Sequence, residues 1–306
     1  MLQKSGIFLV NKPSGMTSND LIKKIQKKLN IKKIGHAGTL DPLASGLMVV
    51  LVNQATKVSD FLLSANKSYN VTAKLFIDTD TKDTTGKVIS QEEPVKIAKK
   101  TIKEVAKKYN GYIYEQYPPI YSAIKVQGKK LYEYARENKG DEVEIKPRTV
   151  TIQECELVEY NKKDHEISFK LKVSKGTYVR SFVTDFANDL NTIATVSKLE
   201  RSASGLFKLS NAKNIEDLSW NNLISLYDTL TKSEQVLIQY HFEQDVRQGK
   251  SIILPRVSFP IVFIVNDKKE VIGIYKHVAN HIYTCQRGLW QDDPAIKKTE
   301  AEMEGY

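Results

Sequence analysis

The sequence predicts an α/β or α+β protein built on a large sheet, followed by a small all-β module. Between residues 6 and 190, short apolar or alternating segments typical of strands are interspersed with amphipathic segments typical of helices. In residues 252–290 the pattern changes to short β-type runs separated by Pro, Asn-Asp and Gly. At roughly 150 residues per domain, a chain of 306 residues suggests about two domains. We therefore expect a second region to begin near residue 240.

The first elements follow from apolar runs and turn residues. Gly6–Val10 is expected to form a short buried strand that ends in a loop at 11–18. A helix should follow, with Ser18 as its N-cap and apolar residues recurring on one face. A polar, glycine-punctuated loop at 34–46 then precedes an apolar strand at 47–52. Because loops on a rigid scaffold often carry function, this loop is the first candidate site.

The next elements are a helix over 54–63 and a strand from Tyr69 to Ile77, where apolar and polar residues alternate. The acidic run 78–86 resembles a calcium-binding loop only superficially, because Lys82 stands at a ligand position. We therefore expect a hairpin turn there rather than a calcium site.

Similar patterns predict the remaining elements of the first region. Pro94 opens a helical segment that extends to about Tyr109. Strands are expected at about 149–160 and 166–174. They are followed by a helix whose inward residues are Phe182, Val183, Phe186 and Leu190.

Positive charge is concentrated in the first part of the chain. The protein has 46 Lys and Arg against 36 Asp and Glu, a formal net charge of +10. Residues 1–180 hold 32 basic and 20 acidic groups, a balance of +12, whereas residues 181–306 hold 14 and 16, a balance of −2. If a polyanion binds, the first 180 residues supply most of the attraction. A solvated lysine-rich surface explains the charge about equally well.

Composition excludes several classes of protein. With 41% hydrophobic residues, 15 Gly and 9 Pro, the chain is typical of a folded protein rather than a fibrous or disordered one. The longest apolar stretches fall far short of the about 18 residues that a membrane helix needs, and the N-terminus lacks the features of a signal peptide. Cys155 and Cys285 alone make no disulfide framework. We expect a cytoplasmic protein without a membrane partner.

A search for common catalytic and metal-binding motifs is negative. The sequence has no GxGxxG after a strand, no CxxC, no HExxH and no GxSxG. His277, His281 and Cys285 are four residues apart, as ligands on a helix would be, but their surroundings are β-type. In a strand, residues four apart are separated by about 13 Å. We therefore expect no metal site.

The loop at 34–46 remains as the candidate site, and Asp41 is its most informative residue. Asp41 lies between Leu40 and Pro42, in a segment stiffened by proline and flanked by glycines. Such an aspartate is either a turn-capping residue or a positioned functional carboxylate, and the pattern by itself favours the cap. His36 has a similar pair of interpretations, as a loop histidine with satisfied hydrogen bonds or as a ligand contact.

Six segments, in order along about residues 6–207, resemble the TruB family, the stand-alone bacterial synthases that make pseudouridine at tRNA position 55. The loop Gly35-His-Ala-Gly-Thr-Leu-Asp-Pro-Leu-Ala-Ser-Gly-Leu47 is similar to the aspartate loop of that family. The other similar segments are Asn11-Lys-Pro-Ser-Gly-Met-Thr-Ser18, Lys67-Ser-Tyr69, Thr79-Asp-Thr81 through Gly86, Pro118 to Arg136, and Ser174-Lys-Gly-Thr-Tyr-Val-Arg180. A colinear match of six motifs makes chance negligible.

The resemblance implies a role for individual residues. Asp41 would be the catalytic aspartate, Tyr69 would pack against the target uracil, and Arg180 would pair with Asp41 and keep it ionised by lowering its pKa. The family places residues equivalent to His36, Tyr178 and Leu199 at the bound nucleotide, and His36 would stack in the space that the extruded nucleotide leaves. The remaining RNA-binding candidates are Lys125, Lys129, Lys130 and Arg136 in the insertion and Lys12, which is nearer to structural support than to catalysis.

The resemblance also implies an architecture. We expect an α+β fold in which a catalytic domain at 1–239 contains a large mixed, mostly antiparallel sheet flanked by helices. An RNA-gripping insertion would lie at about 117–148. Residues 240–306 would form a small β-rich module similar to a PUA domain. If this module touches tRNA, its near-neutral charge implies contacts through shape and local groups rather than through bulk charge.

The implied activity is the isomerisation of uridine to pseudouridine in the T-arm loop of tRNA, with the base flipped into a pocket. The reaction needs no cofactor, because it involves no redox change and no energy input. The carboxylate would attack the ribose or the base, or deprotonate the sugar. A monomer acting without guide RNA is expected, and the protein would also assist tRNA folding. The alternatives are a guide-RNA-dependent synthase acting on ribosomal RNA and a non-catalytic tRNA-binding or folding factor.

Overall fold

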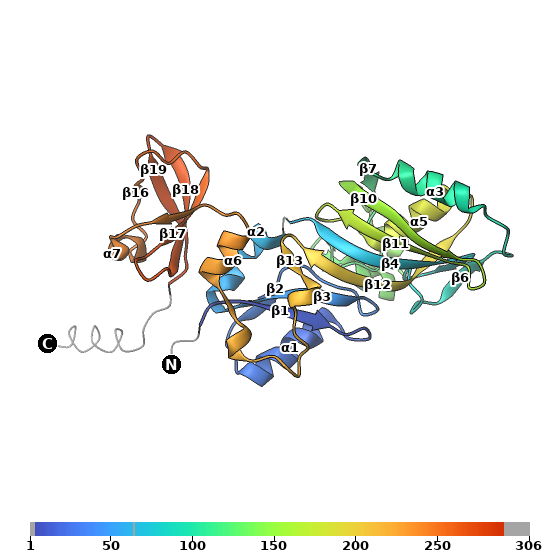
Figure 1. Ribbon diagram of the computed structural model, residues 1–306, viewed down its shortest axis with the longest axis horizontal. Coiled ribbons are helices and arrows are strands. Elements are labelled where there is room, and N and C mark those ends of the chain that lie inside the picture. The colour runs from blue at the N-terminus through green and yellow to red at the C-terminus, as the bar shows by residue number, and fades with distance from the viewer. Residues whose placement is uncertain (1–3, 64, 291–306) are drawn as a thin grey trace.

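The computed structural model describes residues 4–63 and 65–290, which contain two larger β-sheets, one toward each end of an elongated molecule, and two small hairpins (Figure 1). The large sheet has ten strands, and eight of them follow one another in the order β14-β1-β3-β12-β4-β11-β10-β7, with β2 on β3 and β13 on β12. These strands are β1 (Gly6–Lys12), β2 (Ile34–His36), β3 (Ser45–Val52), β4 (Lys67–Leu75), β7 (Tyr112–Gln116), β10 (Arg148–Asn161), β11 (Glu166–Val173), β12 (Ala194–Ser204), β13 (Phe207–Lys208) and β14 (Ile224–Ser225).

The pairing in the large sheet is antiparallel except where β12 meets β3, through Glu200 opposite Ser45 and Arg201 opposite Gly46. This parallel contact joins two halves of the sheet. Gly46 is required there, because its φ is +102° and a Cβ would lie 2.5 Å from the Arg201 carbonyl oxygen. The prediction of a mixed, mostly antiparallel sheet in an α+β fold is confirmed.

Helices cover the two halves of this sheet differently. In chain order, the helices of the described residues are α1 (Ser18–Leu29), α2 (Ser59–Leu63), α3 (Lys99–Lys108), α4 (Leu131–Arg136), α5 (Val179–Asn188), α6 (Leu226–Lys232) and α7 (Glu243–Arg247). Helix α1 packs on Phe8 and Val10 of β1 and on Met48, Val50 and Val52 of β3. Helices α3 and α5 pack on β4, β10, β11 and β12 through Phe169, Phe182 and their neighbours. No helix in the described ranges combines the length and the apolar composition that a membrane crossing requires.

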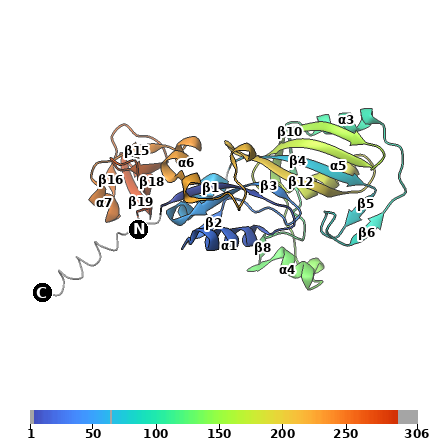
Figure 2. The same ribbon diagram turned by 60° about the horizontal axis from the view of Figure 1, so that its bottom comes forward.

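Two small hairpins project from the large sheet. They are β5 (Ile77–Thr79) with β6 (Val88–Gln91), and β8 (Lys125–Val126) with β9 (Lys129–Lys130). The first contains the acidic turn, so the expectation of a hairpin there is confirmed. Figure 2 shows that β8 and α4 lie on the same side of the large sheet as α1.

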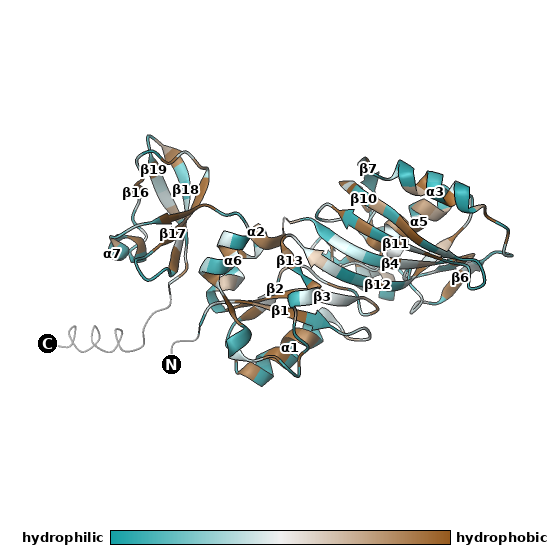
Figure 3. Cartoon of the chain, in the orientation of Figure 1, coloured by the Kyte–Doolittle hydropathy of each residue, from teal (hydrophilic) through white to brown (hydrophobic). Residues whose placement is uncertain are grey.

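The second sheet has the order β15-β17-β18-β19-β16. Its strands are β15 (Leu237–Gln239), β16 (Ile252–Ile253), β17 (Ile261–Val265), β18 (Val271–Ala279) and β19 (Ile282–Gly288). Hydrophobic stretches run along β1 and β17, whereas α3 is mostly hydrophilic (Figure 3). One face of the second sheet packs on the first region, and Phe263 meets Phe61 edge-to-face with ring centroids 5.0 Å apart. Arg287 Nη1 also donates a 2.7 Å hydrogen bond to the Lys57 carbonyl oxygen.

Three local predictions are wrong. The N-cap of α1 is Thr17, whose side chain accepts from the Asp20 amide, because Ser18 already lies inside the helix. The expected helix at 54–63 is a 3-10 helix (Asn53–Val58) followed by α2.

The third concerns the segment after Pro94. Helix α3 begins only at Lys99, and residues 92–98 have no regular structure. Since proline is compatible with the start of a helix without requiring one, Pro94 was a weak start signal. The apolar spacing placed the body of this helix correctly.

Candidate active site

The loop that carries Asp41 connects β2 to β3 and is clamped by the residues that precede and begin α1. The Ser18 hydroxyl accepts a 2.9 Å hydrogen bond from the Leu40 amide and donates one of 2.8 Å to the Leu40 carbonyl oxygen. The Gly15 amide donates to the Pro42 carbonyl oxygen at 2.8 Å, and the Ser14 hydroxyl to that of Leu43 at 2.6 Å. The residues on both sides of Asp41 are therefore fixed to the turn before α1.

Arg201 holds the loop from the other side, and sequence reasoning missed it. Its side chain is 1% exposed. Its Nε donates to the Leu47 carbonyl oxygen at 2.7 Å, Nη2 to that of Gly38 at 3.1 Å and Nη1 to that of Thr39 at 3.3 Å. The available signal was its position two residues after Leu199, because alternate residues of a strand face the same side. A charged residue at such an inward position needs buried partners.

Asp41 and Arg180 meet above this supported loop. Arg180 Nε lies 2.8 Å from Asp41 Oδ2, although the contact lacks the alignment of a normal hydrogen bond. The other two guanidinium nitrogens are directed away from Asp41. Nη1 donates to the Thr81 carbonyl oxygen at 2.7 Å, and Nη2 to that of Tyr121 at 2.9 Å. The β5–β6 turn and the root of the insertion thus orient the guanidinium, which is 4% exposed.

Burial and charge act in opposite directions on the Asp41 carboxyl group. Burial raises its pKa above the ordinary value, while Arg180 and, more weakly, Lys12 lower it and Asp83 raises it. Together these effects raise the pKa of Asp41. The expectation that Arg180 gives Asp41 a low pKa is therefore wrong, because burial outweighs the arginine. The sign of the Arg180 contribution is as expected. About a third of the side-chain surface, 34%, still faces solvent, and this moderates the effect of burial.

Lys12 supports the loop from within the protein. It is fully buried, and its Nζ donates to the carbonyl oxygens of Met16 at 2.6 Å, Pro13 at 2.9 Å and Pro42 at 3.5 Å. Burial lowers its pKa to about 8, although Asp41 opposes this shift. Because no part of Lys12 reaches the surface, its place among the RNA-binding candidates is wrong, and its structural role is the one that the contacts support.

The apolar side of the site comes from neighbouring strands. Tyr69 on β4 and Leu199 on β12 are each 7% exposed and belong to the same buried cluster as Leu40. Val71, two residues after Tyr69, is the register partner of Leu199. The strand pairing therefore brings a tyrosine ring and a leucine side chain together beside the Asp41 loop.

Tyr178 and His36 lie at the edges of this arrangement. Tyr178 precedes α5, and burial raises the pKa of its hydroxyl, which also senses the charges of Asp41 and Arg180. His36 lies on β2, and burial followed by the Arg201 charge lowers its pKa, which favours the neutral imidazole. Its Nδ1 is buried without a hydrogen-bond partner. All the sequence-predicted residues except the insertion group thus adjoin the Asp41 loop or α5.

Gln116 is a second residue that sequence reasoning missed. It is 2% exposed, its Oε1 accepts from the Tyr178 amide at 2.8 Å, and its Nε2 donates to the Tyr178 carbonyl oxygen at 3.1 Å. The same Nε2 lies 2.7 Å from the hydroxyl of Tyr114, which donates to Asp185 at 3.0 Å. This network fixes the start of α5. A buried amide between two tyrosine-rich segments carries no pattern that predicts such a contact.

The insertion carries its cations on a separate arm. Lys125 is on β8, Lys129 and Lys130 are on β9, and Arg136 ends α4. Lys130 Nζ and the Arg136 guanidinium lie 5.3 and 5.1 Å from the centre of the Tyr132 ring. Lys129 Nζ lies 4.8 Å from the Tyr134 ring and 2.5 Å from Glu137. Lys129, Lys130 and Arg136 are thus arranged over aromatic rings, whereas the cation paired with Asp41 is Arg180.

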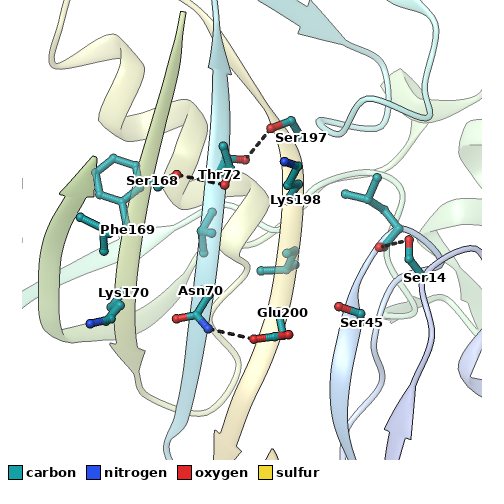
Figure 4. Close-up of a pocket in the computed structure, with 14 residues that line it drawn as sticks. Ser14, Ser45, Asn70, Thr72, Ser168, Phe169, Lys170, Ser197, Lys198 and Glu200 are labelled. Atoms are coloured by element: carbon teal, nitrogen blue, oxygen red, sulfur yellow. Dashed lines mark hydrogen bonds between the residues drawn. The ribbon is translucent and has the colours of Figure 1, made fainter. Parts of the chain in front are cut away.

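A surface groove lies beside the Asp41 loop, and Ser14, Leu43 and Leu199 are among the residues that line it (Figure 4). Its polar groups largely satisfy one another, since Asn70 donates to Glu200 at 2.9 Å and the hydroxyls of Thr72 and Ser168 are 3.1 Å apart. The groove contains neither Asp41 nor Arg180. The groove therefore borders the candidate site through Leu43 and Leu199 without including its charged pair. Among the described residues, no group of three His, Cys, Asp or Glu side chains converges as metal ligands do.

Comparison with known proteins gives consistent similarities. Residues 26–179 match the model of the TruB family pseudouridylate synthase N-terminal domain. A tRNA pseudouridine synthase B from Mycoplasma capricolum is 48% identical over 292 residues, which cover 95% of this chain and 99% of the relative. A protein of the same name from Clostridium tetani is 35% identical over 278 residues, or 88% of this chain and 94% of the relative.

Solved structures are similar at lower identity. A chain in the crystal structure of a Cbf5-Nop10-Gar1 complex superposes with a TM-score of 0.68 and 21% identity, covering 93% of this chain and 85% of that one. A chain in the archaeal box H/ACA Nop10-Cbf5 complex gives 0.67 and 21%, covering 94% and 87%. At this identity the similarity supports the fold alone.

Proposed function

Because this chain belongs to the TruB family of pseudouridylate synthases, we propose that it converts uridine to pseudouridine at position 55 in the T-arm loop of tRNA. One observation carries the proposal. The Asp41 carboxylate is paired with a buried arginine at 2.8 Å, in a loop clamped on both sides, next to the apolar surface of Tyr69 and Leu199. A fixed anion beside an apolar surface suits a reaction on an extruded pyrimidine.

The chemistry requires one bond to be exchanged for another. The C1′–N1 bond of uridine breaks, the uracil turns, a C1′–C5 bond forms, and the proton leaving C5 is balanced by protonation of N1. Asp41 must be ionised to attack C1′, to attack the base, or to take a proton from the sugar. Arg180 supplies the opposing charge that favours the ionised form despite burial.

The surrounding residues have complementary roles in this proposal. Tyr69 and Leu199 provide a stacking and packing surface for the flipped uracil, whose extrusion costs a few kcal/mol. Tyr178 closes the site beside Arg180, and neutral His36 occupies the space that the nucleotide vacates. Lys125, Lys129, Lys130 and Arg136 grip the RNA backbone from the insertion.

The test follows tritium from C5. T-arm hairpin RNA carrying [5-³H]uridine at the target position should release its tritium to water with the wild-type protein. Asp41→Asn keeps the shape of the side chain but removes the charge, so release should fall at least about 1,000-fold. RNA binding by the variant, measured by fluorescence anisotropy, should remain within a few-fold of wild type. Full activity of Asp41→Asn would disprove the assignment of the carboxylate.

The same assay separates the alternatives. A non-catalytic tRNA-binding or folding factor binds the hairpin without releasing tritium. A guide-RNA-dependent enzyme is inactive on a bare tRNA transcript in the absence of other proteins. The 48% identity to a tRNA pseudouridine synthase B over nearly the whole chain favours the stand-alone enzyme.

The division into 1–239 and 240–306, a monomeric state and a cytoplasmic location stay predictions. The contacts of Phe263 and Arg287 with the first region favour a C-terminal module that acts in a fixed orientation.

A further inference from the structure

Three buried side-chain polar atoms in the described residues form no hydrogen bond of normal geometry: His36 Nδ1, Ser122 Oγ and Arg180 Nε, of which Arg180 Nε is ion-paired with Asp41. Such atoms are rare in folded proteins, because an unpaired buried donor or acceptor destabilises the folded state. Two of the three belong to residues already placed at the site. Ser122 is the third, and nothing above gives it a role.

Ser122 lies close to Arg180 and Tyr178 of the candidate active site. It is 5% exposed. The carbonyl oxygen of the preceding residue, Tyr121, accepts the 2.9 Å hydrogen bond from Arg180 Nη2. Its hydroxyl adjoins that of Tyr178 closely enough to influence its pKa, but without the geometry of a normal hydrogen bond. Tyr178 in turn senses the charge of Asp41.

The backbone of Ser122 is fully engaged. Its amide donates to the Ile120 carbonyl oxygen at 2.9 Å, and its carbonyl oxygen accepts from the Tyr132 amide at 3.1 Å. The residue is therefore fixed in place by its main chain. The hydroxyl forms no hydrogen bond of normal geometry, and the polar group that it influences is the Tyr178 hydroxyl at the edge of the site.

We propose that Ser122 is a further substrate-contacting residue, whose hydroxyl forms a hydrogen bond with the target uridine once that nucleotide is bound beside Asp41. The inference rests on the proposed function. A serine hydroxyl both donates and accepts, which matches the carbonyl oxygens, the imide N–H and the ribose hydroxyls of uridine. Because the bond forms only after the nucleotide is extruded, it stabilises the extruded nucleotide and the transition state relative to the initial RNA complex, and so affects turnover more than initial RNA binding.

The test is the variant Ser122→Ala, which removes only the hydroxyl. Single-turnover pseudouridine formation should slow about 10-fold, as the loss of one hydrogen bond predicts. Affinity for the T-arm hairpin should stay within about twofold of wild type, because the other RNA contacts are retained. The melting temperature of the free protein should be unchanged or higher, since an unpaired buried polar group has been removed.

Thr229→Val is the matched control. The Thr229 hydroxyl is also buried, but it donates to the Ser225 carbonyl oxygen at 2.7 Å in α6, far along the chain from the site. Its removal should give the opposite result, a lower melting temperature with unchanged turnover. The pair of variants therefore distinguishes a hydroxyl used for stability from one used for substrate.

Two results would overturn the inference. Turnover by Ser122→Ala equal to that of an active wild type would exclude a substrate contact. A fall in melting temperature that parallels the loss of turnover would make the hydroxyl structural. If the wild type forms no pseudouridine, the proposed function fails and the inference about Ser122 fails with it.

Discussion

The Asp41 loop and the insertion use the same residue types in opposite ways. Around the loop, Lys12, Lys67 and Arg201 are buried, and each donates to backbone carbonyl oxygens. In the insertion, Lys130 and Arg136 lie over a tyrosine ring in a partly exposed arm. The cations around the loop form hydrogen bonds with backbone carbonyl oxygens in place of water. The cations of the insertion remain accessible to a binding partner.

This difference has energetic consequences. Burial lowers the pKa of Lys12 and of Lys67 to about 8, which shows that the protein interior disfavours their charge. Such residues hold a backbone in place through directed bonds. Accessible lysines instead release counterions from RNA and thereby increase affinity. Mutations should therefore separate two effects: positioning of the Asp41 loop by buried cations and attraction of RNA by the cations of the insertion.

The largest effect is expected at Arg180, the buried cation that contacts Asp41. With Arg180→Met, the main effect that opposes burial of Asp41 is removed, and the pKa of its carboxyl group should rise further. A raised pKa leaves more of the carboxyl protonated at a given pH. We expect turnover at neutral pH to fall by at least about 100-fold and the acidic limb of the pH–rate profile to move to higher pH. Single-turnover rates between pH 5 and 9 measure both.

Arg180→Lys is the companion variant for this prediction. It retains the charge but cannot reach the Thr81 and Tyr121 carbonyl oxygens in the same fork. Its acidic limb should remain near that of wild type while its rate falls. If Arg180→Met is slower by one constant factor at every pH, the arginine acts by position alone and the electrostatic argument is wrong.

A smaller effect is expected at Arg201, the buried cation that supports the loop without contacting Asp41. Arg201→Met removes three hydrogen bonds to the carbonyl oxygens of Gly38, Thr39 and Leu47. Since hydrogen bonds to charged groups contribute about 1.5–3 kcal/mol and burial of the charge offsets part of this, we expect a loss of about 3 kcal/mol. The melting temperature should fall by roughly 5–10 °C, and turnover should decrease with it.

Arg247→Met provides the control for an exposed arginine. Arg247 pairs with Glu243 at the surface of α7, and such pairs contribute about 0–1 kcal/mol. A similar loss of stability in both variants would contradict the distinction between buried and exposed cations.

The smallest effect on chemistry is expected in the insertion. Replacing Lys129 and Lys130 by alanine should weaken RNA binding and reduce the slope of log affinity against log salt by about 2, one for each lysine. The rate at saturating RNA should be unchanged. Replacing Lys99 and Lys100 on α3 by alanine gives a matched double variant. It removes the same charge from the end of the large sheet that lies away from the second sheet (Figure 1). An equal loss of affinity in both variants would mean that bulk charge, not the insertion, attracts RNA.

Local patterns predicted much of the fold. Alternation placed β4, β10 and β11, and apolar spacing placed the bodies of α1 and α5. The errors lie at element boundaries, such as the Thr17 N-cap and the start of α3 at Lys99. The boundary of a helix or strand depends on one or two residues, and several residue types are compatible with it. The buried face of a helix or strand depends instead on a pattern repeated over many residues.

The sequence by itself determined the family, through six motifs in order, and with it the candidate residues Asp41, Tyr69 and Arg180. It did not reveal Arg201, Gln116 or Ser122. Arg201 meets the carbonyl oxygens of residues 38–47 only because the parallel pairing of β12 with β3 brings together segments more than 150 residues apart. Whether a polar group has a partner depends on what surrounds it in space, so only the tertiary structure decided that Arg201 is satisfied and that the Ser122 hydroxyl is not.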